Sequence, residues 1–294
     1  MLIQPKTLLE FREKGIYIYD NSSIAKFLSC PLYYNYKHEL GLTRKDTTPG
    51  FGLTFGQCLH AALKVWVDSS KNDTLASKKF IQLFKPHEEQ PNISKKTGKE
   101  LSATYTTLYG CSLLLAYFNK YRNDTRPIAF TEIAVMEELA PDVYYGGRID
   151  KLLEEPRFAD YKSTKYPNNI LINPNPQFMG YKFLTSKLLD KNVSGEVDIL
   201  PVSKTKDPEE QLIRIPFDYT PYQMENWRKS MIYHINQITN CRSMNYWPQA
   251  WDCTPFGRYE CDYSPLCTLT KAEALMPLMQ SMYAIEHWDF MSEI

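Results

Sequence analysis

The chain of 294 residues carries 34 basic and 34 acidic side chains, so its overall charge points to no polyanionic partner and excludes neither nucleic acid nor protein. Its length and its 43% of hydrophobic residues suffice for one large or two modest domains with a sizeable core. The first residues carry no signal-peptide pattern, and no stretch approaches the roughly 18 uninterrupted apolar residues of a membrane span, so we expect a cytoplasmic protein.

The N-terminal half is predicted to be helical. Ser22 and Ser23 precede an apolar-periodic run, and Pro31 is typical of the first turn of a second short helix. Apolar side chains recur at helical spacing over residues 55–67, and the segment 99–122 is predicted to be a long helix. The predicted apolar face of the helix over 55–67 consists of Phe55, Leu59, Ala62, Leu63 and Trp66.

From about residue 127 the apolar pattern changes to that of strands. Three β-rich segments separated by turn residues predict a three-stranded meander, at 128–139, 143–154 and 157–165. Asn175 and Pro176 are typical of the cap and first position of a helix. Strands over 196–202 and 211–219 follow, and then a long helix from Pro221. The order predicts an α/β fold with an αβββαβ core and helical additions at both ends.

The stretch GGRIDKLLEEPRFADYKSTKY (146–166) places three charged side chains where a half-buried hairpin normally has apolar ones. Asp160 and Lys162 are two apart and share a face, and the hairpin brings Asp150 back alongside Asp160. Two carboxylates so close are costly unless a cation lies between them, and oxygen ligands suit Mg²⁺ or Mn²⁺. Lys162 is then free to hold the attacking water or to stabilise charge on a phosphate.

Simpler alternatives exist for the same residues. Asp150 and Lys162 can form an exposed cross-strand ion pair, with Asp160 as a solvated acid, and such pairs are common and worth about 0 to 1 kcal/mol. Gln177 and Tyr181 share one face near a helix N-terminus, from which they can reach a phosphodiester. The alternative is that Tyr181 packs and Gln177 is solvated.

Three of the seven cysteines lie close together in the sequence. Cys253, Cys261 and Cys267 are separated by seven and then five residues, and Cys30 stands alone before a proline. Four thiolates can hold zinc or a [4Fe-4S] cluster, and four buried free thiols are the third alternative. Tight C-x-x-C knuckles are missing, which disfavours zinc, but spacing alone does not choose.

Four motifs carry a family resemblance: GQCLH (56–60), GGRID (146–150), DYK (160–162) and QFMGY (177–181). Together they resemble the motifs of the PD-(D/E)XK nuclease superfamily, and most of all its RecB-type nuclease domains, which include CRISPR-associated iron-sulfur exonucleases and their viral relatives. The resemblance implies a restriction-endonuclease-like core with a mixed central sheet.

The resemblance also implies roles for individual residues. His60, Asp150 and Asp160 would hold Mg²⁺ or Mn²⁺, Lys162 would assist the water, and Gln177 and Tyr181 would contact DNA or orient the lysine. The role of Glu132, on the preceding strand, is left open. Cys30, Cys253, Cys261 and Cys267 would ligate a [4Fe-4S] cluster that ties the helical N-terminal arm to the tail.

As a whole, the resemblance implies one nuclease domain over 1–294, with a helical part at 20–125, a catalytic core at 126–240 and a cysteine-rich segment at 241–294. Its expected activity is metal-dependent hydrolysis of DNA, as an exonuclease on single strands or frayed ends, without sequence readout. Recombination or CRISPR-adaptation proteins are expected partners, and a prokaryotic or viral origin is expected.

Two functions of other classes remain as alternatives: a non-catalytic DNA-binding or recombination partner, and a zinc-stabilised structural module. A missing ligand or lysine would mark the former, and neither is missing from the motifs. Five basic side chains are candidates for contacts to the DNA strand, and the simpler interpretation is that they form a solvated surface. They are Lys95, Lys96, Lys99, Arg44 and Lys45.

Overall fold

The computed structural model describes residues 8–46, 51–89, 105–203, 207–251, 253, 261–287 and 289–290. The chain divides into two compact units, and each is assembled from segments that are distant in sequence. One unit comprises Met1–Thr48, Ala134–Gly147 and Thr220–Glu293, and the other is built mainly from Pro49–Ile133 and Arg148–Tyr219. Strands β3 (Ile128–Ala140) and β4 (Val143–Leu153) run from one unit into the other.

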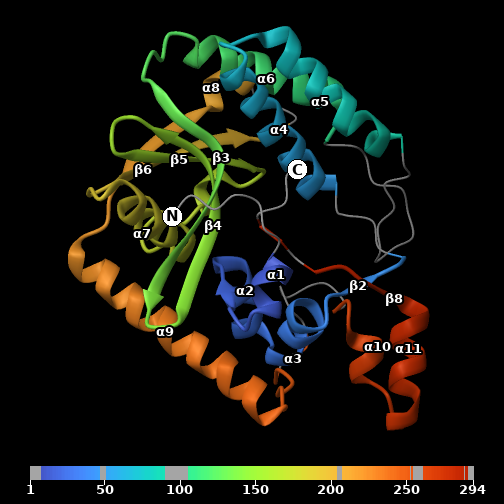
Figure 1. Cartoon of the computed structure of the whole chain (residues 1–294). Coiled ribbons are helices and arrows are strands. Elements are labelled where there is room, and N and C mark those ends of the chain that lie inside the picture. Colours follow the sequence, from blue (N-terminus) through green and yellow to red (C-terminus); the bar gives the residue numbers. More distant parts are fainter. Residues whose placement is uncertain are drawn as a thin grey trace. The chain divides into compact units, whose positions relative to one another are not determined.

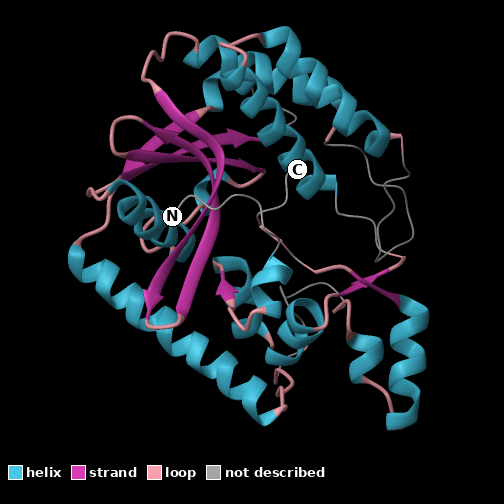
Figure 2. Ribbon diagram, in the orientation of Figure 1, coloured by secondary structure: helices cyan, strands magenta, loops and turns pink. Residues whose placement is uncertain are grey.

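A mixed sheet organises the unit around residues 148–219 (Figure 2). Its strand order is β4-β5-β6-β7, with β3 paired to β4; β5 and β6 are parallel, whereas β4–β5 and β6–β7 are antiparallel. The new strands are β5 (Arg157–Thr164), β6 (Ser194–Pro201) and β7 (Ile213–Phe217). The predicted α/β class, mixed sheet and αβββαβ order are confirmed.

Helices cover both faces of this sheet. Helices α4 (Phe51–Asp68), α5 (Asp73–Glu88) and α6 (Thr107–Tyr121) pack together beside the face that carries Tyr161 (Figure 1). Helix α7 (Pro176–Leu189) covers the other face, where Phe178 stacks on Phe217 with ring centroids 5.0 Å apart. Short elements complete this unit: the 3₁₀ turn Pro167–Asn169 and α8 (Pro208–Gln211).

The core of the unit is aromatic. The predicted face of α4 is buried, and Phe55 packs edge-on against Phe80 and Phe84 of α5. Helix α5 was not among the predicted elements. The five side chains predicted for the apolar face of α4 are all at most 4% exposed: Phe55, Leu59, Ala62, Leu63 and Trp66.

The other unit joins both ends of the chain. Strand β1 (Ile18–Tyr19) pairs in parallel with β4, and β2 (Leu42–Arg44) pairs antiparallel with β8 (Tyr283–Ile285). A small core of Tyr36, Leu42, Tyr263, Leu266 and Tyr283 lies near that pair. The remaining elements are α1 (Leu8–Glu13), α2 (Asn21–Ser29), α3 (Pro31–Tyr34), the π-helix Asn35–Glu39, α9 (Pro221–Met244), α10 (Ser264–Cys267), the 3₁₀ turn Ala272–Ala274 and α11 (Leu275–Met282).

Two helix starts differ from the predicted ones. Helix α2 is capped by Asp20, whose Oδ1 accepts the Ser23 N–H at 2.6 Å in a capping box, so Ser22 and Ser23 lie inside the helix rather than before it. Helix α6 begins at Thr107, after its N-cap Thr106, and the part of the predicted helix over 99–104 lies outside the described residues. Among the described helices, none combines the length and the apolar character needed to cross a membrane.

Candidate active site

Strands β4 and β5 deliver the three charged residues of the central motif. The paired residues Lys151 with Ala159 and Leu152 with Phe158 put Asp150 next to Asp160 in the antiparallel register. Next to these pairs, the backbone N–H of Tyr161 donates to the side chain of Asp150, at 2.8 Å from Oδ2, instead of to a backbone carbonyl of β4. The carboxylate is thereby fixed in a buried position.

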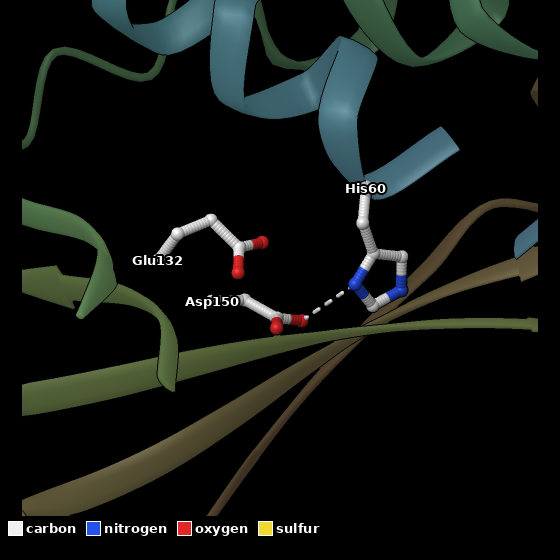
Figure 3. Close-up of side chains that lie close together, drawn as sticks. All are labelled: His60, Glu132 and Asp150. Atoms are coloured by element: carbon white, nitrogen blue, oxygen red, sulfur yellow. Dashed lines mark ion pairs between the residues drawn. The ribbon is translucent and has the colours of Figure 1, made fainter. Parts of the chain in front are cut away.

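Helix α4 brings His60 to the same place. His60 Nδ1 lies 3.3 Å from Asp150 Oδ2 (Figure 3). The centroids of the imidazole and of the Tyr161 ring are 5.7 Å apart, in an edge-on arrangement. One turn earlier, a Cβ at Gly56 would lie 2.9 Å from Ser163 Oγ, so glycine lets the helix approach β5 this closely. This explains the glycine four residues before the histidine.

Glu132 on β3 joins His60 and Asp150, and together they form the group best suited to hold a metal. Their ligand atoms all lie within 4.8 Å of one another, and Figure 3 shows the two carboxylates and the imidazole converging. The backbone of Glu132 has φ of +50°, a left-handed conformation that is strained for a non-glycine residue and recurs at functional sites. Asp160 is not in this group.

The predicted ligand set of His60, Asp150 and Asp160 therefore stays a prediction. Glu132 and Asp160 are alternatives for the third metal ligand. The family resemblance pointed to Glu132 but left its role open. Strand alternation does not place its carboxylate, because Glu132 itself has a left-handed backbone conformation. Its orientation is a tertiary property. Arg148 Nη1 lies 3.9 Å from its carboxylate.

Burial and proximity shift the pKa values in this group. Burial, reinforced by the charge of Asp150, raises the pKa of Glu132 to about 7. Burial opposes a charge on His60, but the Asp150 carboxylate outweighs it and raises the pKa of His60 to about 9. For Asp150 burial acts upward, yet His60 holds the pKa below its usual range. A divalent cation would relieve the same repulsion, so the donor set fits Mg²⁺ or Mn²⁺.

Lys162 pairs with the acid on its own strand, so the simple cross-strand pair with Asp150 is not the arrangement found. Its Nζ lies 2.8 Å from Asp160 Oδ2, while 30% of its side chain is exposed. Asp160 is buried, and burial raises its pKa to about 6 even though Lys162 acts to lower it. A buried acid thus holds an ammonium that still reaches solvent.

Gln177 and Tyr181 occupy the first turns of α7, as predicted. Asn175 caps this helix by accepting the N–H groups of Gln177 and Phe178, at 3.0 and 3.2 Å. Gln177 Nε2 donates to Tyr181 Oη at 2.9 Å, so the two side chains form a pair. Phe178, between them, has the Lys162 ammonium 5.6 Å above its ring centroid. Contacts of the pair with DNA stay a prediction.

The four cysteines of the predicted cluster line one cavity of about 200 Å³ in the other unit. All seven cysteines are described, and all are free thiols. Cys58 and Cys241 are buried, and Cys111 packs against the core. Of the proposed strand contacts, Lys95, Lys96 and Lys99 lie outside the described residues; Arg44 pairs with Asp46, and Lys45 Nζ donates to the Gln280 carbonyl at 2.8 Å.

The family is identified by a match that covers most of the chain. The sequence profile of the PD-(D/E)XK nuclease superfamily matches residues 21–268, and the chain therefore belongs to this superfamily. Membership makes it a nuclease-family protein with a plausible divalent-metal site at His60, Glu132 and Asp150. No curated protein matches the chain.

Solved structures agree at the level of the fold. A protein from Eubacterium rectale described as a candidate exonuclease superposes with a TM-score of 0.55 and 14% identity, over 94% of this chain and 98% of its own. At that identity the likeness shows the fold alone. The structure of SSO0001 gives a TM-score of only 0.31 and 11% identity, over 91% of this chain and 98% of its own, and carries no argument.

Proposed function

We propose that this chain is a metal-dependent DNA nuclease that removes nucleotides from single strands or frayed ends, without reading their sequence. The observation that carries the proposal is the convergence of His60, Glu132 and Asp150 near the ion pair of Lys162 with Asp160. Two carboxylates and an imidazole suit Mg²⁺ or Mn²⁺. The exonuclease part is supported by the sequence motifs and by the description of the Eubacterium rectale protein.

The contacts of each residue support a task in hydrolysis. A divalent cation, when bound, polarises a phosphate oxygen and makes water a better nucleophile. Asp150 is held in place for a ligand by the Tyr161 N–H and faces His60. Lys162, positioned by Asp160 and partly exposed, can donate to a phosphate oxygen while a water–phosphorus bond forms and the bond to the leaving oxygen breaks.

A nuclease assay with open and end-blocked DNA, single- and double-stranded, tests chemistry and end requirement together. We expect cleavage of open single strands with Mg²⁺ or Mn²⁺, none in chelator, and none of circular single strands. Cleavage of circles would contradict the exonuclease part. Binding of DNA without cleavage under any metal would instead support the non-catalytic alternative.

Replacing Glu132 by glutamine separates the two possible ligand sets. If Glu132 holds the metal, Glu132→Gln should weaken Mn²⁺ binding by at least the roughly 10- to 100-fold loss seen for residues that merely support ligands. Isothermal titration measures this, with Asp160→Asn as the matched comparison. If Glu132→Gln keeps the parental Mn²⁺ affinity and Asp160→Asn loses it, Asp160 rather than Glu132 is the third metal ligand.

The same variant carries a second readout in chelator. Glu132 is a buried carboxylate beside Asp150, which costs stability when no metal is bound. Glu132→Gln should therefore raise the Tm of the metal-free protein. A lower Tm would indicate that Glu132 is a structural partner of Arg148, from which it is 3.9 Å away.

We further propose that Cys30, Cys253, Cys261 and Cys267 hold a [4Fe-4S] cluster. Their shared cavity of about 200 Å³ supports this, as do N–H groups aimed at the sulfurs. Cys30 Sγ accepts from the N–H groups of Tyr33 and Ala250, both at 3.4 Å. Hydrogen bonds to ligating sulfurs are a usual feature of iron-sulfur sites.

The spacing of the sulfurs does not match a preformed zinc site. In a tetrahedral zinc site with Zn–S bonds near 2.3 Å, sulfurs lie roughly 3.8 Å apart. Within the described part of the chain, however, no three of these cysteines come within 4.8 Å of one another. Sulfurs spread around a cavity leave room for a multi-atom cluster.

Replacing Cys261 by serine should remove the brown colour and the iron of the anaerobically purified protein and lower its Tm, because four-cysteine ligation is lost. Absorbance in the visible range and an iron assay measure the outcome. Cys111→Ser, a cysteine outside the cavity, is the control. Bound zinc with no colour in the parent would support the zinc module instead.

A further inference from the structure

A second cavity lies beside Tyr161, on the face of the sheet that α4 and α6 cover. Because side chains alternate along a strand, Lys151 points away from the face that Asp150 occupies. Lys151 lines a cavity of about 270 Å³ in the same unit, and its aromatic walls are Trp66, Tyr117, Tyr121 and Tyr161. The nuclease mechanism proposed above uses none of these side chains' polar atoms.

Lys151 is a buried cation whose nearest carboxylates lie beyond hydrogen-bond distance. It is 4% exposed, and its Nζ lies 4.0 Å from Glu196 Oε1 and 3.9 Å from Asp198 Oδ2. Both distances exceed those of a hydrogen bond. The same ammonium lies 5.4 Å from the centroid of the Tyr161 ring, as a cation–π contact. A ligand that brings acceptor oxygens into the cavity can therefore add the short hydrogen bonds that these contacts do not supply.

The two nearby carboxylates are already engaged. Glu196 receives both guanidinium nitrogens of Arg126, at 2.7 and 3.0 Å. Asp198 receives Nε and Nη2 of Arg214, at 2.5 and 2.7 Å. Such two-point pairs are the strongest ion pairs available to a carboxylate, so Glu196 and Asp198 are held by the two arginines and make only long ion pairs with Lys151.

The charge around the cavity favours an anion. The lining includes four cationic side chains, Lys71, Arg126, Lys151 and Arg214, and one carboxylate, Asp124. Counting Glu196 and Asp198 behind the lining still leaves one positive charge in excess. Lysine commonly meets phosphate as a point charge, and a phosphate offers several acceptor oxygens for one ammonium and its neighbours.

We propose that this cavity binds a phosphate group, either as inorganic phosphate or as the terminal phosphate of a mononucleotide, with Lys151 as its principal donor. The volume exceeds that of a phosphate alone, which leaves space for part of a nucleoside. The site is separate from the metal site and does not depend on nuclease activity.

Phosphate binding is measured on the full chain with its metal present, by thermal unfolding with inorganic phosphate, deoxyadenosine monophosphate or acetate. At concentrations well above Kd, linkage predicts a rise of about 2 to 4 °C in Tm for phosphate or the mononucleotide and none for acetate. Lys151→Met should abolish the rise, whereas Lys187→Met, at an exposed lysine of α7, should keep it. A larger rise with the mononucleotide identifies that source, and equal rises identify the bare phosphate.

A fluorescence titration keeps the test independent of whether Lys151→Met folds. Phosphate should change the parental tryptophan emission, and Trp66→Phe should remove that change because Trp66 lines the cavity. The proposal is overturned by a response unchanged in Lys151→Met, by a response lost in Lys162→Met, which would place the anion at the metal site, or by a response to acetate alone. No response to any of the three would leave the cavity to water and would equally overturn it.

Discussion

Replacing Lys162 by methionine is expected to lower the rate of DNA cleavage by about 100- to 1,000-fold, with little change in folding or DNA affinity. The ammonium, held 2.8 Å from Asp160 and partly exposed, is proposed to act on charge that develops only in the transition state. Methionine keeps an unbranched side chain but removes the ammonium that lies over Phe178. Single-turnover cleavage with Mg²⁺ measures the effect.

Lys187→Met, at an exposed lysine of α7, is the matched control and should cleave at the parental rate. Mn²⁺ titration of Lys162→Met tests for an indirect effect on metal binding. Burial raises the pKa of Asp160 to about 6 although the charge of Lys162 acts to lower it, so losing that charge would favour protonated Asp160. Parental cleavage would remove Lys162 from the mechanism. A loss of metal affinity that matches the loss of rate would show that Lys162 works through Asp160 rather than on the phosphate.

Replacing Asp150 by asparagine should reduce cleavage below detection and weaken Mn²⁺ binding more than Glu132→Gln does. The Asp150 carboxylate contacts both α4 and β5. Its Oδ2 lies 3.3 Å from His60 Nδ1 and 2.8 Å from the Tyr161 backbone nitrogen. The expected loss of affinity exceeds the roughly 10- to 100-fold effect of supporting residues. Calorimetric titration and the cleavage assay measure the two losses separately.

Asparagine keeps an oxygen that can accept the Tyr161 N–H, so the strand geometry should survive and unfolding should remain cooperative. Glu210→Gln, at an exposed carboxylate of α8, is the control for loss of one negative charge. Mn²⁺ binding at parental strength in Asp150→Asn would place the metal elsewhere and would refute the proposed site.

Local patterns were enough to predict five of the six strands of the sheet, but not the short strand β1. Alternation and turn residues located β3, β4 and β5, and the two-residue spacing of Asp160 and Lys162 put both on one face. Helix α5 was missed because its buried residues recur only every fourth position among polar ones, as Ala76, Phe80 and Phe84, and Pro86 lies inside it. A stripe this narrow is a weak signal in sequence.

The candidate site was predictable only in part. His60 and the central motif came from the family resemblance, and the structure brings His60 to Asp150. Glu132 could not be placed, because its backbone conformation rather than the strand pattern decides where its carboxylate points. The distances among the cysteine sulfurs likewise depend on how distant segments fold, and spacing along the chain does not contain them.

The left-handed backbone at Glu132 has a consequence for protein engineering. Glycine adopts such a φ without the penalty that an L side chain incurs, so Glu132→Gly would relieve both strain and a buried charge. A library selected only for heat resistance would therefore tend to accumulate substitutions here and to discard the acid. Any stabilised version of this chain should be screened for metal uptake before its added robustness is counted as an improvement.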